Sequence, residues 1–210
     1  MPLDSPAPPS LATLPVFRAA LLKTTVGGGS WKYDNLVGIL SEISEEAPSG
    51  AVSFAVEIIA EAQALNEPVA WVAGTESIFF PPDLLERGID LSALTVVRAG
   101  GETESLTAAE WLVRSGAIGL VIVDAEGRWN VTDSSLGRIL KVAERNLCAV
   151  VFLTRKRRED LSLGSRISLR GCVMRSDPST VKIYTIKDKR SNLSSQQNRH
   201  YHGPSGMYQH

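Results

Sequence analysis

The sequence of 210 residues is short of side chains that bind metals or form disulfides, with 2 cysteines and 3 histidines. All three histidines lie among the last eleven residues, so the rest of the chain has too few ligands for a zinc site. Cys148 and Cys172 stand in apolar, strand-like segments and are expected to be reduced core residues. We expect neither a metal nor another cofactor.

Long apolar runs are also missing. No run approaches the roughly 18 residues of a membrane span. The first residues lack the basic region and apolar stretch that mark a signal peptide. We therefore expect a cytoplasmic protein with no membrane association. The hydrophobic content of 43% is ample for the core of one domain.

The net charge of −1 hides an uneven distribution. Residues 1–154 carry 10 basic and 19 acidic side chains, whereas residues 155–190 carry 11 basic and 4 acidic ones. A basic segment of this kind forms either a local surface for an anionic partner or a solvated edge of the domain.

The chain divides into three parts. Residues 1–10 contain four prolines and are expected to be an extended arm, followed by a short amphipathic helix over Val16–Lys23 and a glycine run at 27–29. This N-terminal attachment, 1–30, packs either on its own domain or on a neighbouring subunit. Residues 31–190 form the core domain, and the polar residues 191–210 are expected to be a disordered tail.

Within the core, strand-like and helical patterns alternate. This order predicts an α/β fold with a mostly parallel twisted sheet, helices on both faces and a C-terminal antiparallel strand pair. The expected strands are 36–43, 68–73, 94–98, 117–124, 148–153, 166–174 and 180–186; the expected helices are 48–65, 81–87, 103–115 and 133–145.

The segment 39–54 reads as a buried strand, a turn of small residues and the start of a long helix. In an α/β protein this is the place of a phosphate-binding loop, where backbone N–H groups at a helix N-terminus face an anion.

Several segments together resemble bacterial RecA recombinases, in the same order. The resemblance covers about residues 36–190 and implies a RecA-like core. It is carried by the strand and phosphate loop (42–53), the segment before the third core strand (88–94), the helix ending Arg-Ser-Gly-Ala (109–117), the following apolar strand (120–124) and a late strand with a Lys-rich end (181–189).

The phosphate loop departs from the family at the positions that bind nucleotide. Such a loop needs a glycine first, a lysine for the β- and γ-phosphates and a hydroxyl for Mg²⁺. Glu45, Ala51 and Val52 stand there instead, although Gly50 is retained, and Glu46 adds a second carboxylate. The negative carboxylates of Glu45 and Glu46 would repel the negative triphosphate of ATP, so we expect no ATPase activity. Ser44, Glu45 and Glu46 are better suited to capping the helix.

The other catalytic positions of the family are also only partly retained. Asp124 is retained at the end of its strand, but Thr75 replaces the family's acid, with Glu76 one residue later. Alone, Asp124 is more typical of a turn or helix cap. A different enzyme using Asp124, Glu76 and Thr154 stays an alternative, without a visible nucleophile–base pair. The segments matching the two DNA-binding loops of recombinases are short, so we expect no recombinase activity.

Two bacterial families resemble RecA and lack this loop chemistry. The ImuA family supports translesion synthesis, and resemblance to it implies a non-catalytic accessory protein of the SOS response to DNA damage. Its implied partners are RecA, an ImuB-like protein or an error-prone polymerase subunit. The first alternative is a SulA-like division inhibitor that binds FtsZ, and the second is a RecA-like DNA-binding protein. The strand pair within 166–186 and the basic run favour the ImuA family or a direct RecA relative over SulA, and of these two we prefer ImuA. An oligomer would form through the N-terminal helix.

Two sets of residues are candidate contacts for a partner. The basic set suits weak non-specific DNA binding or an acidic protein, with a solvated edge as the alternative; it comprises Arg155, Lys156, Arg157, Arg158, Arg166 and Arg170. The aromatic set is Phe79, Phe80 and Trp129. The alternative for the two phenylalanines is that they fix a short helix to the core.

Overall fold

The computed structural model describes residues 31–46, 50–75, 77, 79–125, 129–177, 180–190 and 196–200, the last five by their backbone alone. The expected N-terminal arm and helix lie outside the described residues.

One eight-stranded sheet organises the domain, with the strand order β3-β2-β4-β5-β1-β6-β7-β8. All pairs from β3 to β6 are parallel, and β6–β7 and β7–β8 are antiparallel. The predicted fold class is confirmed. The strands are β1 Leu40–Ser44, β2 Val69–Ala73, β3 Leu94–Arg98, β4 Leu120–Ala125, β5 Ala149–Thr154, β6 Leu169–Asp177, β7 Thr180–Asp188 and β8 Gln196–His200.

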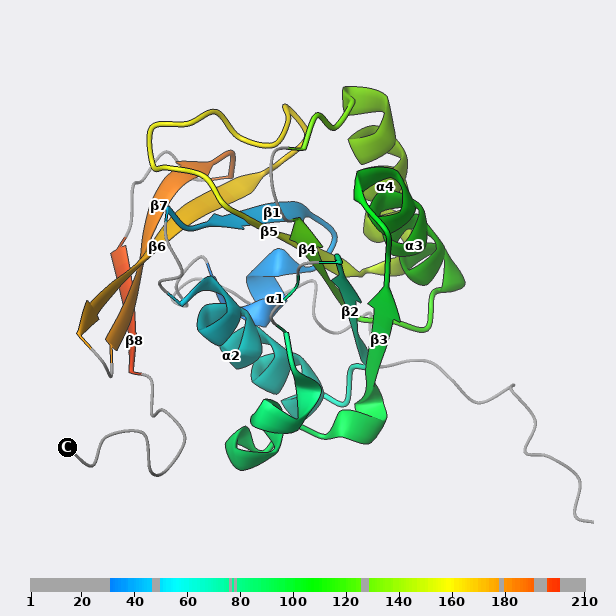
Figure 1. The fold of residues 1–210 in the computed structure, drawn as a ribbon. Helices are drawn as coiled ribbons and strands as arrows, with labels where there is room; N and C mark the ends of the chain where they lie inside the picture. The colour runs from blue at the N-terminus through cyan, green and yellow to red at the C-terminus, as the bar shows by residue number, and fades with distance from the viewer. Residues whose placement is uncertain are drawn as a thin grey trace, which may run out of the picture.

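Helices cover both faces of this sheet (Figure 1). One face carries α1 (Tyr33–Leu36), α2 (Ala51–Ala64) and the 3₁₀ helix η2 (Pro81–Arg87), which is followed by η3 (Leu91–Ala93). The other carries α3 (Glu102–Ser115) and α4 (Asp133–Asn146). The central strands β4 and β5 are buried along almost their whole length, which explains their continuous apolar sequences.

The first strand is shorter than expected, because residues before Leu40 do not extend it. Leu36 closes the short helix α1. Trp31 anchors this entry segment: its ring meets Phe54 of α2 edge-on at 6.1 Å, and its Nε1 donates a hydrogen bond to Thr185 Oγ1 at 3.0 Å. Packing against α2 therefore overrides the strand-like pattern of this stretch.

Two expectations about the C-terminal part are corrected. Arg175 and Asp177 pair with Val181 and Thr180, so the strands continue through most of the segment expected to be a turn. Residues 196–200 are not disordered but form β8, which is hydrogen-bonded to β7. A free strand edge supplies backbone partners to a polar segment, and composition alone does not reveal this.

The loop between β5 and β6, residues 155–168, takes the place of a helix over part of the sheet (Figure 1, yellow). Leu163 and Ile167 are buried in the same core layer as Leu136 and Ile139 of α4. The loop thereby covers the end of the sheet that α3 and α4 leave open.

Candidate functional site

The segments expected to form the degenerate nucleotide site do meet in space. Strands β4, β5 and β1 are neighbours in the sheet, and their carboxyl ends lie at one edge. The helix α2 begins there, at Ala51, with Gly50 before it. In parallel α/β sheets this edge is where ligands bind.

Glu45 fills the position in which an anion would meet α2. Its Oε2 accepts hydrogen bonds from the backbone N–H groups of Gly50 and Ala51, at 3.1 and 3.0 Å. These are donors at the start of the helix that otherwise have no partner within it. The negative charge also interacts favourably with the helix dipole. A side chain of the protein thus occupies the anion position.

The other two candidate caps, Ser44 and Glu46, make different interactions. Ser44 Oγ donates a hydrogen bond to the carbonyl of Gly171, at 3.2 Å, and so ties β1 to β6. Glu46 forms an exposed ion pair with Arg157, at 3.3 Å. The capping interpretation therefore holds for Glu45 and not for Ser44 or Glu46.

Gly50 is held in a conformation that suits glycine. Its φ is 121°, in the region that other residues avoid. A Cβ on Gly50 would also lie 2.9 Å from Cγ2 of Val181 on β7. Ala51 is buried and Val52 packs against the core. Both side chains are hydrocarbons, so neither offers a charge or a hydroxyl to a phosphate.

Asp124 forms a hydrogen bond with the segment that follows β2. Its Oδ2 accepts a hydrogen bond of 2.6 Å from Ser77 Oγ, which in turn accepts one from the backbone N–H of Phe79. Burial raises the pKa of Asp124 above its ordinary value, against the hydrogen bond from Ser77 and the charge of Arg155. Asp124 thus caps the turn after β2, as its position at a strand end indicates.

The space between these residues is small. A cavity of about 20 Å³ is lined by Glu45, Val52, Asp124 and Arg155, together with Ala51, Leu153 and Thr154. This volume suits about one water molecule, whereas typical ligand pockets measure roughly 300–1,000 Å³. The cavity that the described residues enclose is therefore much smaller than a nucleotide pocket.

Among the described residues near this edge, Glu42 has several polar partners, and the sequence reasoning missed it. Its carboxylate is fully buried in the middle of β1. It accepts hydrogen bonds from Thr154 Oγ1 at 2.9 Å, Ser162 Oγ at 2.9 Å and the backbone N–H of Leu163 at 2.8 Å. An acid in the middle of an otherwise uncharged strand that is expected to be buried was the available signal, because buried charges need partners.

Two cations complete the environment of Glu42. Lys156 Nζ lies 3.3 Å from its Oε1, and Arg170 Nε lies 3.8 Å from its Oε2. Arg170 is itself buried and also donates to the carbonyls of Arg157 and Asp160. The network therefore fixes the loop 155–168. Thr154 donates its hydroxyl hydrogen to Glu42, so it does not serve the alternative enzyme site of Asp124, Glu76 and Thr154. Glu76 lies outside the described residues.

The basic candidate contacts separate into two groups. Arg170 is buried and Lys156 is bound within the network, so neither forms an open contact surface. Arg155, Arg157, Arg158 and Arg166 are exposed. Arg158 places its guanidinium 5.4 Å from the centre of the Tyr184 ring, which orients it on β7.

The aromatic candidates also separate. Phe79 is buried and its ring stacks on Trp71 at 3.8 Å, so it belongs to the core, which corrects its choice as a contact. Phe80 is 57% exposed, and Trp129 is half-buried against the α3–α4 core layer. The most exposed tryptophan, Trp111 at 73%, was not chosen from the sequence because a helical pattern does not reveal which positions stay uncovered.

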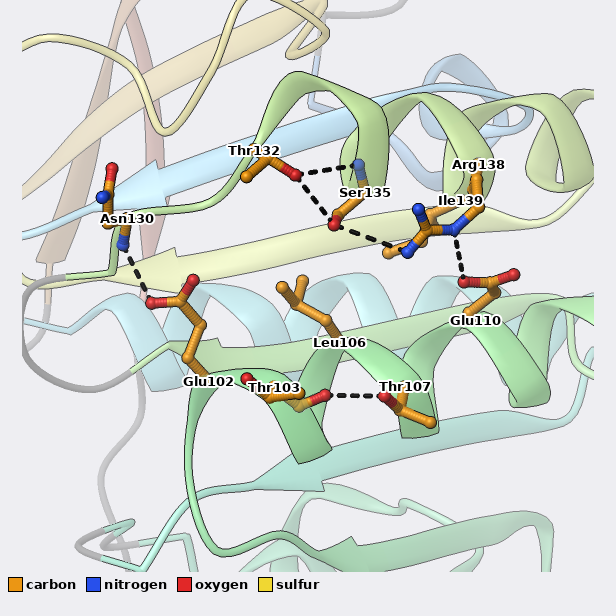
Figure 2. A pocket seen from close by; sticks show the side chains of 10 residues that line it. All are labelled: Glu102, Thr103, Leu106, Thr107, Glu110, Asn130, Thr132, Ser135, Arg138 and Ile139. Atoms are coloured by element: carbon orange, nitrogen blue, oxygen red, sulfur yellow. Dashed lines mark hydrogen bonds and ion pairs between the residues drawn. The ribbon is translucent and has the colours of Figure 1, made fainter.

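A second, larger hollow lies between α3 and α4, on the face of the sheet opposite to the one that α2 covers (Figure 2). It measures about 200 Å³, and Leu106 and Ile139 supply its apolar part. Glu110 of α3 forms ion pairs with Arg138 of α4 at 3.2 Å and with Arg114 at 2.5 Å. Although partial burial would raise the pKa of Glu110, these hydrogen bonds hold it below the ordinary value.

The residues that the structure describes contain no cluster of three potential metal ligands. Across the same part of the chain, every helix is too short or too polar to cross a membrane.

Comparison with known proteins finds similarity to RecA. The chain is 30% identical to Protein RecA of Chlorobium chlorochromatii over 151 residues, which are 63% of this chain and 42% of that protein. It is 29% identical to Protein RecA of Chlorobium limicola over 63% of this chain and 43% of that protein, and 29% identical to that of Haemophilus ducreyi over 58% and 37%. No protein-family model matches.

The chain thus spans less than half the length of the relatives that it matches. The similarity and the sheet topology together support a RecA-like superfamily relationship.

Proposed function

We propose that this protein is a non-catalytic RecA-like accessory protein that acts by binding other proteins in the bacterial response to DNA damage. The observation that carries the proposal is the Glu45 carboxylate on the N-terminus of α2. A carboxylate that already satisfies these N–H groups excludes a phosphate by occupancy and by charge. The small cavity beside it supports the same conclusion.

The ImuA-like role is the specific form of this proposal. It rests on the similarity to RecA and on a core that keeps the sheet while its nucleotide loop is filled by Glu45. The partners would be RecA, an ImuB-like protein or an error-prone polymerase subunit. The exposed side chains for such contacts are Arg155, Arg157 and Arg158 of the loop after β5, and Phe80 before η2.

Nucleotide binding is tested first, by isothermal titration calorimetry with ATP and Mg²⁺. We expect no binding heat and no phosphate release. Binding of ATP by the wild-type protein would contradict the non-catalytic assignment, since Glu45 would then have to leave α2.

Partner binding is tested by immobilising the full chain and presenting RecA filaments, an ImuB-like protein and FtsZ in separate experiments. We expect binding to RecA or the ImuB-like protein, and weaker binding by a variant in which Arg155, Arg157 and Arg158 are all changed to Ser. Leu65→Ser, at an exposed position on α2's end, is the matched control. Binding to FtsZ alone would favour the SulA-like alternative.

Direct DNA binding is separated by titrating a fluorescent oligonucleotide at low and high salt. Contacts from exposed arginines to phosphates would weaken steeply as salt rises. Binding at low salt that the triple Ser variant loses would favour the RecA-like DNA-binding alternative.

A further inference from the structure

The loop between β5 and β6 presents one leucine to water (Figure 1, yellow). Leu161 has 88% of its surface exposed, more than any other large apolar side chain among the described residues. Leu163, two positions later, is buried in the core layer of α4. The backbone therefore directs one leucine outward and the next one inward.

Hydrogen bonds fix the backbone on both sides of Leu161. Its own carbonyl accepts a hydrogen bond from Lys156 Nζ at 3.2 Å. The preceding carbonyl, of Asp160, accepts one from the buried Arg170. The two residues that follow are bound to the buried carboxylate of Glu42. The position of Leu161 is therefore set by polar contacts of the surrounding backbone and not by packing of its own side chain.

A fixed, exposed apolar side chain is suited to binding. Single exposed leucines are common on protein surfaces, and what distinguishes Leu161 is the buried charge network that holds its backbone. A group that is already held in place loses little conformational freedom when a partner covers it. An aliphatic side chain of this kind can serve as the anchor that fills a pocket on a partner.

The tip of the loop is acidic. Glu159 and Asp160 directly precede Leu161, and both are exposed. Within the described part of the chain neither carboxylate forms an ion pair, and that of Asp160 accepts a hydrogen bond from the backbone N–H of Arg157 at 2.8 Å. The apolar anchor is thus flanked by two negative charges.

The four basic side chains before the tip each lie near a group of the molecule itself. The charge of Arg155 acts on Asp124, Lys156 pairs with Glu42, Arg157 pairs with Glu46, and Arg158 lies over the ring of Tyr184. The acids of the tip have no such partner, so a surface that covers Leu161 is complementary only if it brings positive groups beside them. The phosphates of DNA would instead be repelled there.

We propose that Leu161 is an anchor for protein binding: it enters an apolar pocket of a partner protein, and basic residues at the rim of that pocket meet Glu159 and Asp160. This role rests on the protein-binding function proposed above and names a contact within it. It lies at the tip of the loop, apart from the arginines at its start.

Binding to the immobilised full chain tests the anchor, with RecA filaments, an ImuB-like protein and FtsZ presented separately. We expect Leu161→Ser to weaken binding at least about tenfold, as the loss of one buried leucine contact implies. Leu161→Met is expected to bind nearly as the wild type, because methionine is apolar and of similar volume. Leu65→Ser, at a position 46% exposed at the end of α2, is the matched control and is expected to leave binding unchanged.

The outcomes separate this proposal from the function on which it rests. A partner that binds the wild type and Leu161→Ser equally would overturn the anchor and leave the protein-binding function intact. Failure of all three proteins to bind the wild type would contradict that function and the anchor with it.

Charge reversal tests the rim of the pocket. Glu159→Lys is expected to weaken binding of the same partner, and Glu159→Gln is expected to weaken it less, because only the lysine adds a like charge against a basic rim. Unchanged or stronger binding by Glu159→Lys would contradict the basic rim.

A fluorescent oligonucleotide separates a protein contact from a nucleic-acid contact. At low salt we expect Leu161→Ser and the wild type to respond to it equally, whether or not the arginines of the loop contact phosphates. Oligonucleotide binding that Leu161→Ser loses would overturn the proposal, because Leu161 would then serve a nucleic acid.

The fixed backbone is tested with Lys156→Met, which keeps an apolar stem and removes the hydrogen bond to the carbonyl of Leu161. Amide hydrogen exchange is expected to rise in residues 159–163, and partner binding is expected to weaken although Leu161 is still present. Unchanged exchange at the tip, or faster exchange with unchanged binding, would contradict the role of the fixed backbone.

Discussion

Removal of the Glu42 carboxylate tests how the loop 155–168 is held. Glu42→Ala deletes an acceptor of three hydrogen bonds, from Thr154, Ser162 and Leu163. It also leaves the buried guanidinium of Arg170 without its nearby negative charge. The substitution therefore combines lost hydrogen bonds with an uncompensated buried cation.

The expected magnitude follows from that combination. Breaking a buried ion pair by removing one partner costs about 3–5 kcal/mol. A domain of this kind has a total stability of about 5–15 kcal/mol, so Glu42→Ala is expected to remove a large share of it. Glu42→Gln keeps the shape and one acceptor oxygen but also removes the negative charge beside Arg170, so it is expected to cost only somewhat less than Glu42→Ala.

Urea denaturation followed by circular dichroism gives the free energy of unfolding, and amide hydrogen exchange reports on the loop. Exchange is expected to rise in residues 155–168 and to change little in α3. The control is Glu46→Ala, which removes an exposed ion pair with Arg157 and is expected to cost less than about 1 kcal/mol. A loss below about 1 kcal/mol in Glu42→Ala, with unchanged exchange in the loop, would refute the reasoning.

Three further predictions concern the edge near α2. Glu45→Ala leaves the N–H groups of Gly50 and Ala51 uncapped and is expected to destabilise by about 1 kcal/mol, with Glu45→Gln losing less; urea denaturation of both variants checks this. Gly50→Ala is expected to cost about 1–3 kcal/mol through its φ of 121° and the contact with Val181, and a melting temperature equal to the wild type would contradict it. The raised pKa of Asp124 means that the folded state binds its proton more tightly than the unfolded state. The free energy of unfolding of the wild type, relative to that of Asp124→Asn, should therefore fall as pH rises from 3.8 to the raised pKa and then stay constant. Urea denaturation of both proteins at several pH values measures it. A difference between their unfolding free energies that does not change with pH would contradict the prediction.

Much of the fold could be predicted because it depends on local patterns. Runs such as Val121–Val123 and Val150–Phe152 are apolar on both sides, as strands between two helical layers must be. The loss of phosphate-binding chemistry could also be read directly, since it depends on the residue types at positions 45, 51 and 52.

The candidate contacts were predicted less well, because burial depends on residues distant in sequence. Arg170 belongs to a basic series in the sequence, yet the loop after β5 folds over it and Glu42 lies beside it on the neighbouring strand. Phe79 stands next to Phe80, but only Phe79 finds the ring of Trp71. Composition cannot distinguish these neighbours.

The sequence by itself determined the order of strands and helices and the absence of the lysine and hydroxyl that a phosphate loop needs, because both are properties of single residues and short periods. The tertiary structure alone decided that Glu45 occupies the anion position, that Glu42 holds the loop 155–168, and that Trp111 stays uncovered. Each of these depends on which surfaces the folded chain brings together and which it leaves exposed to water.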